Sequence, residues 1–142
     1  MNNNLTTKFM EALQAAQRSA QSAGRAQIYP AELMLALVQQ EGGVLASVLN
    51  KAGVDPKRLS AEMESLLQKQ PRQRGGVAQS PGLSQELDRD LNAAEEMRRQ
   101  MKDDYLSVEH FVLGVMREDA ELTRALEAAG LTQAKYMQAL KE

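Results

Sequence analysis

The chain has 142 residues, a formal net charge of −2 and no cysteine, which excludes a disulfide framework, thiol catalysis and zinc held by cysteines. A charge so close to neutral gives no field that favours nucleic acid, and no apolar run approaches the roughly 20 residues that cross a bilayer. Aromatic residues make up 4%, whereas helix formers such as Ala, Leu, Gln and Glu are abundant, so the composition predicts an all-α protein.

Four helices are predicted in the first half of the chain. The first spans about 7–23, where apolar residues recur every three or four positions, and Gly24 ends it. Pro30 opens the second helix, because a missing N–H costs nothing at the first helical position. A short third helix ends at Gly53, and Asp55 caps the fourth.

The second half repeats the pattern of the first. When 83–142 is placed beneath 5–68 at an offset of 78, apolar residues fall on apolar residues. After a loss of one residue from the second copy, an offset of 77 restores the match, and Gly53 falls on Gly130. The matching pairs include Leu5 and Leu83, Phe9 and Leu87, Ile28 and Leu106, and Leu33 and Phe111.

This duplication predicts the domain organisation. We expect one domain over 1–142, a pseudo-twofold duplicated four-helix repeat with about eight helices. The first copy is 5–68, the second is 83–142, and the Gln-, Arg- and Gly-rich stretch 69–82 is the connector. In the second copy Ser107 and Thr132 occupy the cap positions of two helices.

Several segments carry a resemblance to a known family. They are Leu5-Thr6-Thr7-Lys8-Phe9, Glu41-Gly42-Gly43, Lys51-Ala52-Gly53-Val54-Asp55-Pro56, Leu83-Ser84-Gln85-Glu86-Leu87, Asp104-Tyr105-Leu106-Ser107-Val108-Glu109-His110 and Ala129-Gly130-Leu131-Thr132. The sequence resembles the amino-terminal domain of the ClpB-type protein disaggregases, within the Clp family of ring-forming ATP-driven chaperones. The resemblance covers nearly the whole chain.

The resemblance implies a role in capturing substrate. It implies a domain at the entrance of a homohexameric ring that binds unfolded or aggregated polypeptide, directly or with an adaptor protein. ATP and Mg would be cofactors of later domains, since this chain lacks the Gly-x4-Gly-Lys-Ser/Thr loop that cradles phosphates. An alternative is an adaptor-docking domain of a Clp protease ATPase or a secretion-linked Clp ATPase.

A candidate binding groove emerges from residues that are apolar in only one copy. In the second copy, Met97 falls opposite Ser19 of the first, and Tyr105 falls opposite Gln27. For Tyr29 and Ser107 the apolar residue is in the first copy and the polar one in the second. A flexible Met beside a Tyr suits a surface that accepts varied sequences. We therefore expect a shallow groove for extended peptide, although a lone Met on a helix is more often core. Its predicted lining is Ala93, Met97, Tyr105 and His110.

Three polar residues join the candidate site through the resemblance alone. Thr6, Asp103 and Glu109 match positions associated with substrate handling in the family. Each also has a structural interpretation, because Thr6 can cap the first helix, Asp103 can order a loop and Glu109 suits a first helical turn. His110 is the only histidine, so a metal or catalytic site lacks further ligands or a nucleophile.

We accordingly expect neither a catalytic site nor a cofactor in this chain. The first residues lack the basic and apolar regions of a signal peptide, which predicts a cytoplasmic protein without a membrane partner. Without a heptad seam, the isolated domain is expected to be monomeric.

Overall fold

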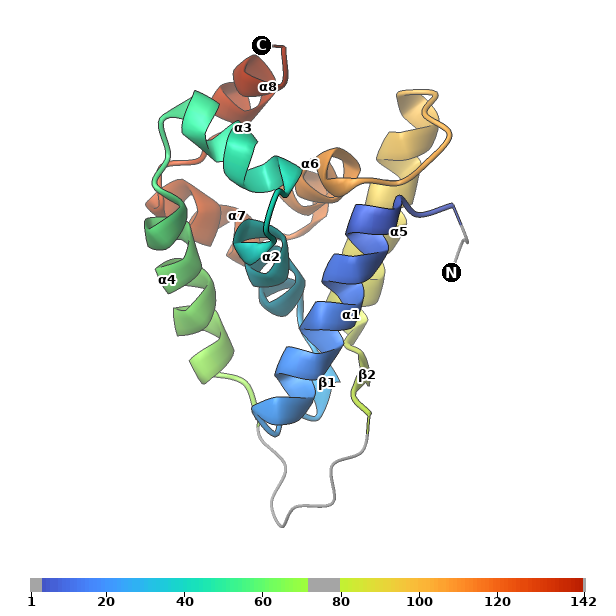
Figure 1. The fold of residues 1–142 in the computed structure, drawn as a ribbon, viewed down its shortest axis with the longest axis vertical. Helices are drawn as coiled ribbons and strands as arrows, with labels where there is room; N and C mark the ends of the chain where they lie inside the picture. Colours follow the sequence, from blue (N-terminus) through green and yellow to red (C-terminus); the bar gives the residue numbers. More distant parts are fainter. Residues whose placement is uncertain (1–3, 72–79, 142) are drawn as a thin grey trace.

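The computed structural model describes residues 4–71 and 80–141, which form eight α-helices and two short strands (Figure 1). The first copy contains α1 (Thr7–Ser22), β1 (Gln27–Ile28), α2 (Pro30–Gln39), α3 (Val44–Ala52) and α4 (Pro56–Gln68). The second contains β2 (Gly82–Leu83), α5 (Gln85–Gln100), α6 (Val108–Glu118), α7 (Ala120–Ala128) and α8 (Gln133–Leu140). The predicted all-α class is confirmed. The expected connector, 69–82, falls largely on 72–79, which lies outside the described residues.

The helices begin where short polar side chains can cap them. Thr6 Oγ1 accepts a hydrogen bond of 3.2 Å from the N–H of Phe9 at the start of α1. Asp55 and Thr132 cap α4 and α8 in the same way, and Ser107 is the cap residue of α6. Each such bond satisfies a backbone donor that the helix leaves unpaired, and losing one costs about 1 kcal/mol.

A pair of equivalent backbone contacts relates the two copies. Leu5 forms a parallel bridge with Leu106, and the N–H of Thr6 donates to the carbonyl of Leu106 over 3.0 Å. At the equivalent place β1 pairs in parallel with β2, and the N–H of Ser84 donates to the carbonyl of Ile28, also over 3.0 Å. The extended segment before the first helix of each copy therefore bonds to the extended segment before the second helix of the other copy.

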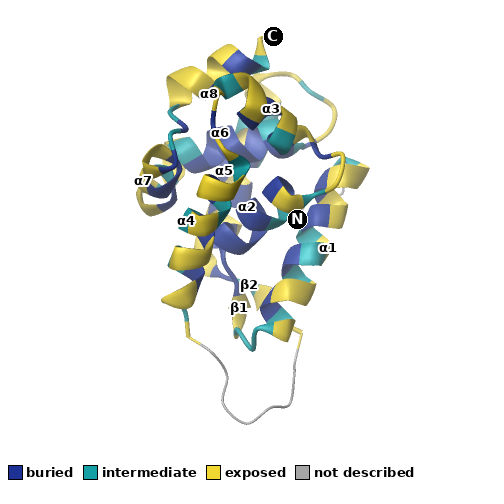
Figure 2. Ribbon diagram, turned by 60° about the vertical axis from the view of Figure 1, so that its left-hand side comes forward, coloured by how far each residue is buried: buried dark blue, intermediate teal, exposed yellow. Residues whose placement is uncertain are grey.

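The helices interlock in the same reciprocal way. α3 packs on α8, and α4 packs on α7, so the third helix of each copy contacts the fourth helix of the other. Within the core the rings of Phe9 on α1 and Phe111 on α6 lie 5.8 Å apart, centre to centre. Figure 2 shows α2 and α6 mostly buried at the centre, with exposed outer faces on the helices around them. One core is shared by both copies.

One turn departs from the repeat. Gly24 follows α1 with a φ of 74°, and its counterpart after α5 is Lys102, with a φ of 60°. A side chain is strained in this left-handed region because its Cβ approaches the backbone carbonyl. The turn keeps its shape in both copies, although only the first has the glycine that suits it.

Candidate functional site

The loop before α6 brings together two of the predicted site residues, His110 and Asp103. His110 is 1% exposed, and its Nδ1 accepts a hydrogen bond of 2.9 Å from the N–H of Ser107. That bond places the ring proton on Nε2, which lies 2.7 Å from Oδ2 of Asp103. Arg98 donates to the carbonyl of Asp103 over 2.7 Å. The described contacts of His110 and Asp103 therefore hold the loop in place.

The expected groove between α5 and α6 takes a different form in the structure. Ala93 and His110 are buried, and Met97 is half-buried against the core. The helices approach closely because Gly114 has no side chain, and a Cβ there would lie 2.7 Å from a backbone nitrogen of α5. Tyr105 alone of the four expected lining residues is strongly exposed, at 59%. The expectation that His110 and Ala93 line an open groove is thus corrected, because tight packing of α5 on α6 fills that space.

The two remaining predicted residues lie at helix starts. Thr6 caps α1, as described above, and Glu109 is half-buried in the first turn of α6. A carboxylate there is favoured by the positive end of the helix dipole. Thr6 differs from the other predicted residues in also lining an apolar pocket.

An apolar pocket opens where the starts of α1, α3 and α6 meet, and we call it the open pocket. Its volume is about 230 Å³. Val44, 46% exposed, and the exposed Lys8 lie at its mouth, while Phe9 and Leu45 form its floor. It is lined by Thr6, Lys8, Phe9, Leu37, Gln40, Val44, Leu45, Ser107 and Val108. Pockets with mostly apolar walls and few polar groups are typical of ligand-binding sites.

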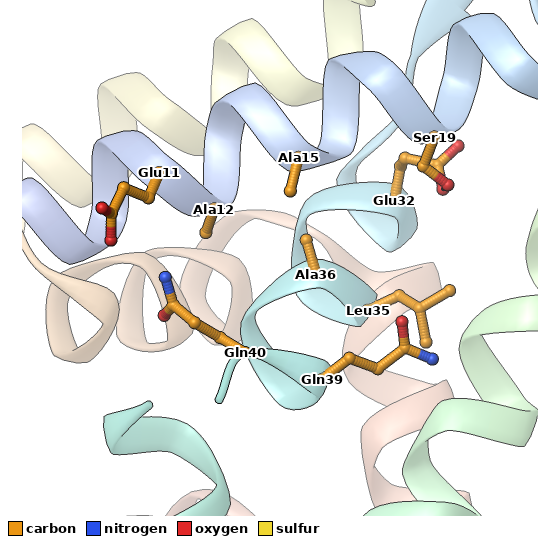
Figure 3. A pocket seen from close by; sticks show the side chains of 9 residues that line it. All are labelled: Glu11, Ala12, Ala15, Ser19, Glu32, Leu35, Ala36, Gln39 and Gln40. Atoms are coloured by element: carbon orange, nitrogen blue, oxygen red, sulfur yellow. The ribbon is translucent and has the colours of Figure 1, made fainter. Parts of the chain in front are cut away.

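A second hollow, of about 190 Å³, lies between α1 and α2 (Figure 3). Glu32 and Ser19 lie at one end of it, and Glu11 and Gln40 at the other. Ser19 donates to Oε2 of the buried Glu32 over 3.0 Å, and Nε of Arg25 lies 3.2 Å from Oε1 in an ion pair that falls short of hydrogen-bond geometry. Burial raises the pKa of Glu32, and Arg25 and Ser19 oppose the rise. The carboxylate already has partners within the chain.

A buried acid lies between α5 and the start of α7. Asp90 is 1% exposed, and loss of hydration raises its pKa to about 9. A hydrogen bond with Asp119 and the negative charge of that residue raise it further, whereas Arg89 opposes the rise. Asp119 caps α7 by accepting a 3.0 Å hydrogen bond from Leu122. Asp90 is therefore protonated at neutral pH, and we assign it to structure rather than to chemistry.

Two other kinds of site are absent from the described residues. Within 4–71 and 80–141, no group of three or more His, Cys, Asp or Glu residues is arranged to hold a metal ion. No helix in the same part of the chain is both long and apolar enough to cross a membrane.

Comparison with known proteins decides the family. Residues 4–129 match the family described as the Clp repeat (R) N-terminal domain. The chain belongs to this family. The chaperone protein ClpB of Corynebacterium efficiens is 36% identical over 91% of the chain, and that of Porphyromonas gingivalis is 33% identical over 99%. The chain spans 15% and 16% of the length of these two relatives. The predicted membership of the Clp family is thus confirmed.

Solved Clp N-terminal domains share the fold. The N-terminal domain of Hsp104 from Candida albicans superposes with a TM-score of 0.82 at 18% identity, over 98% of this chain and 91% of that one. A ClpV N-domain in complex with a VipB peptide superposes with a TM-score of 0.73 at 16% identity, over 96% and 86%. At these identities the likeness concerns the fold alone.

Sequence reasoning overlooked most of the open pocket. Phe9 and Leu45 were visible only as core positions shared by the two copies, because a periodic pattern does not reveal where a core opens to solvent. The signal that would have found the pocket is the mismatch between Tyr29 and Ser107, where the second copy has the smaller side chain. Such mismatches alone predict exposed apolar residues, whereas Tyr29 is buried.

Proposed function

We propose that this chain is the substrate-capturing N-terminal domain of an ATP-dependent Clp chaperone of the disaggregase type. In this proposal it binds exposed apolar segments of unfolded or aggregated polypeptide and presents them to the ring of the full-length protein. The open pocket is the observation on which the proposal rests. Among its nine described lining residues Lys8 alone is charged, so an apolar side chain entering it would displace water from an apolar wall.

Two further considerations support capture of polypeptide. The similar ClpV N-domain forms a complex with a VipB peptide, which makes peptide a natural ligand class for a domain of this fold. A pocket of this size holds only one or two side chains, so each contact is weak. In a homohexamer, six tethered domains would raise the effective concentration of such weak sites.

The remaining expectations belong to the same proposal. We place ATP and Mg in later domains of the full-length protein and propose that the chain itself holds no cofactor and catalyses no reaction. We also propose that the isolated domain is monomeric, acts in the cytoplasm, and binds neither nucleic acid nor membrane.

An NMR titration tests this function. The isotope-labelled chain is titrated with a protein held unfolded, and separately with the same protein folded. We expect shifts around Thr6, Phe9 and Val44 with the unfolded form only. Val44→Glu should weaken the binding, whereas Met137→Glu, which changes a similarly exposed apolar residue outside the open pocket, should leave it intact.

The alternative is docking of one folded adaptor, as in Clp proteases or secretion systems. It predicts no shifts with either form of the test protein and saturable binding of a specific folded partner. Shifts could instead occur around Met97 and Tyr105, with none at the open pocket. This result would place the binding surface in the α5–α6 region and refute our assignment of the pocket.

A further inference from the structure

The open pocket has a counterpart in the other half of the molecule, which we call the closed pocket. Its volume is about 40 Å³. It is lined by Tyr29, Pro30, Ala31, Leu66, Gln70, Glu86, Asp119, Glu121 and Leu122. Five of these residues are equivalent, in the alignment of the two copies, to lining residues of the open pocket. The pairs are Tyr29 and Ser107, Pro30 and Val108, Glu86 and Lys8, Glu121 and Val44, and Leu122 and Leu45.

The counterpart is closed mainly because it contains an aromatic side chain of the chain itself. Tyr29 is 8% exposed and belongs to the hydrophobic core. Leu66 and Gln70, at the end of α4, cover another side of the closed pocket. At the position equivalent to Tyr29 the second copy has Ser107, whose side chain is too short to fill the same space. The open pocket therefore lacks both the tyrosine and the cover that α4 gives to the closed one.

The hydroxyl end of Tyr29 has a defined electrostatic environment. Burial raises the pKa of Tyr29, and the negative charge of Glu86 raises it further. Tyrosine suits such a position, since its ring is apolar and its hydroxyl reaches the polar rim. In the open pocket the residue equivalent to Glu86 is Lys8.

The two rims carry opposite charge. Glu86, Asp119 and Glu121 line the closed pocket, and no basic residue is among its described lining residues. Lys8 provides the single charge of the open pocket, in a chain whose net charge is −2. A ligand of the open pocket is therefore attracted when it carries carboxylates beside the side chain that enters.

We infer that the open pocket accepts a tyrosine side chain of a polypeptide segment that has acidic residues beside the tyrosine. The inference rests on the proposed function and specifies which segments of an unfolded chain bind. The ring occupies the space that Tyr29 occupies in the other copy, between Phe9 and Leu45. The hydroxyl and the flanking carboxylates lie at the mouth, within the field of Lys8.

Substitutions at Ser107 test the inference directly. Ser107→Tyr restores the residue found in the closed pocket and fills the open one from within. Ser107→Ala removes the same hydroxyl but leaves the pocket empty, so it is the matched control. Binding is measured by fluorescence anisotropy with short labelled peptides that differ only at a central Tyr, Leu or Ala between aspartates, and thermal melting shows that each variant folds.

We expect the tyrosine peptide to bind about tenfold more tightly than the alanine peptide, and Ser107→Tyr to lose this preference while Ser107→Ala keeps it. Lys8→Glu should reverse the preference for flanking charges, so that peptides with lysines beside the tyrosine bind more tightly than peptides with aspartates. Equal binding of the tyrosine and alanine peptides, or a preference unchanged by Ser107→Tyr, would overturn the inference. The proposed function fails separately, if the unfolded protein of the NMR titration does not bind.

The protein itself offers a competing occupant. Leu66 and Gln70 at the end of α4 cover part of the closed pocket, so a segment of the protein's own chain is the occupant that competes with a peptide for the open one. The same peptides are therefore tested on the full-length protein. Retention of the tyrosine preference there supports the inference, and its loss would assign the pocket to the protein's own chain.

Discussion

Replacing Asp90 by Asn should stabilise the protein, and the gain should grow with pH. Asp90 has a folded-state pKa of about 9 against an ordinary value of 3.8. Between these values the folded state binds a proton that the unfolded state has lost, so stability falls as pH rises. At neutral pH the cost reaches about 4 kcal/mol, since each pKa unit corresponds to about 1.4 kcal/mol. Asn does not ionise, and its amide can still donate to Asp119.

Urea denaturation followed by circular dichroism measures this effect between about pH 4 and pH 9, the window in which the two states differ in protonation. The two proteins should have nearly equal stability at the acidic end and diverge steadily above it. Glu96→Gln, at an exposed position of the same helix, is the control and should show no such divergence. A stability difference that does not depend on pH would refute the assignment of a protonated Asp90.

Three further predictions concern backbone and charge. Lys102→Gly should raise the free energy of unfolding, measured in urea, by about 1 kcal/mol, whereas Gly24→Ala should lower it by a similar amount. If both substitutions changed stability in the same direction, the strain argument would be contradicted. Gly114→Ala should cost more than about 2 kcal/mol because its Cβ meets backbone, while Gly82→Ala, which meets open space, stays near zero. Arg25→Met leaves the buried carboxylate of Glu32 without its ion-pair partner and should lower stability by about 3 kcal/mol. An unchanged urea midpoint would show that the pair does not stabilise the protein.

Much of the fold could be predicted from the sequence because its signals are local. The caps at Thr6, Asp55 and Thr132 each depend on a side chain reaching a backbone N–H two or three residues away. Comparison of the two copies also predicts core residues, because positions that are apolar in both copies are buried in the structure. Phe9 and Phe111 are examples.

The shape of the candidate site could not be predicted in the same way. Whether a hollow opens between two helices depends on how closely they approach, and α5 approaches α6 because of a single glycine, Gly114. A mismatch between copies also has two physical meanings, an exposed apolar residue or a filled cavity. Tyr105 is of the first kind and Tyr29 of the second, and only packing distinguishes them.

The reciprocal bonding of the two copies has a consequence for how the protein unfolds. Leu106, which bonds to the segment before α1, belongs to the second copy, and β1, which bonds to the segment before α5, belongs to the first. Neither copy contains all the partners of its own backbone, so we expect neither to fold by itself. The domain should therefore open as one cooperative unit, with amide protection in α2 and α6 lost together, and damage to either copy weakens both.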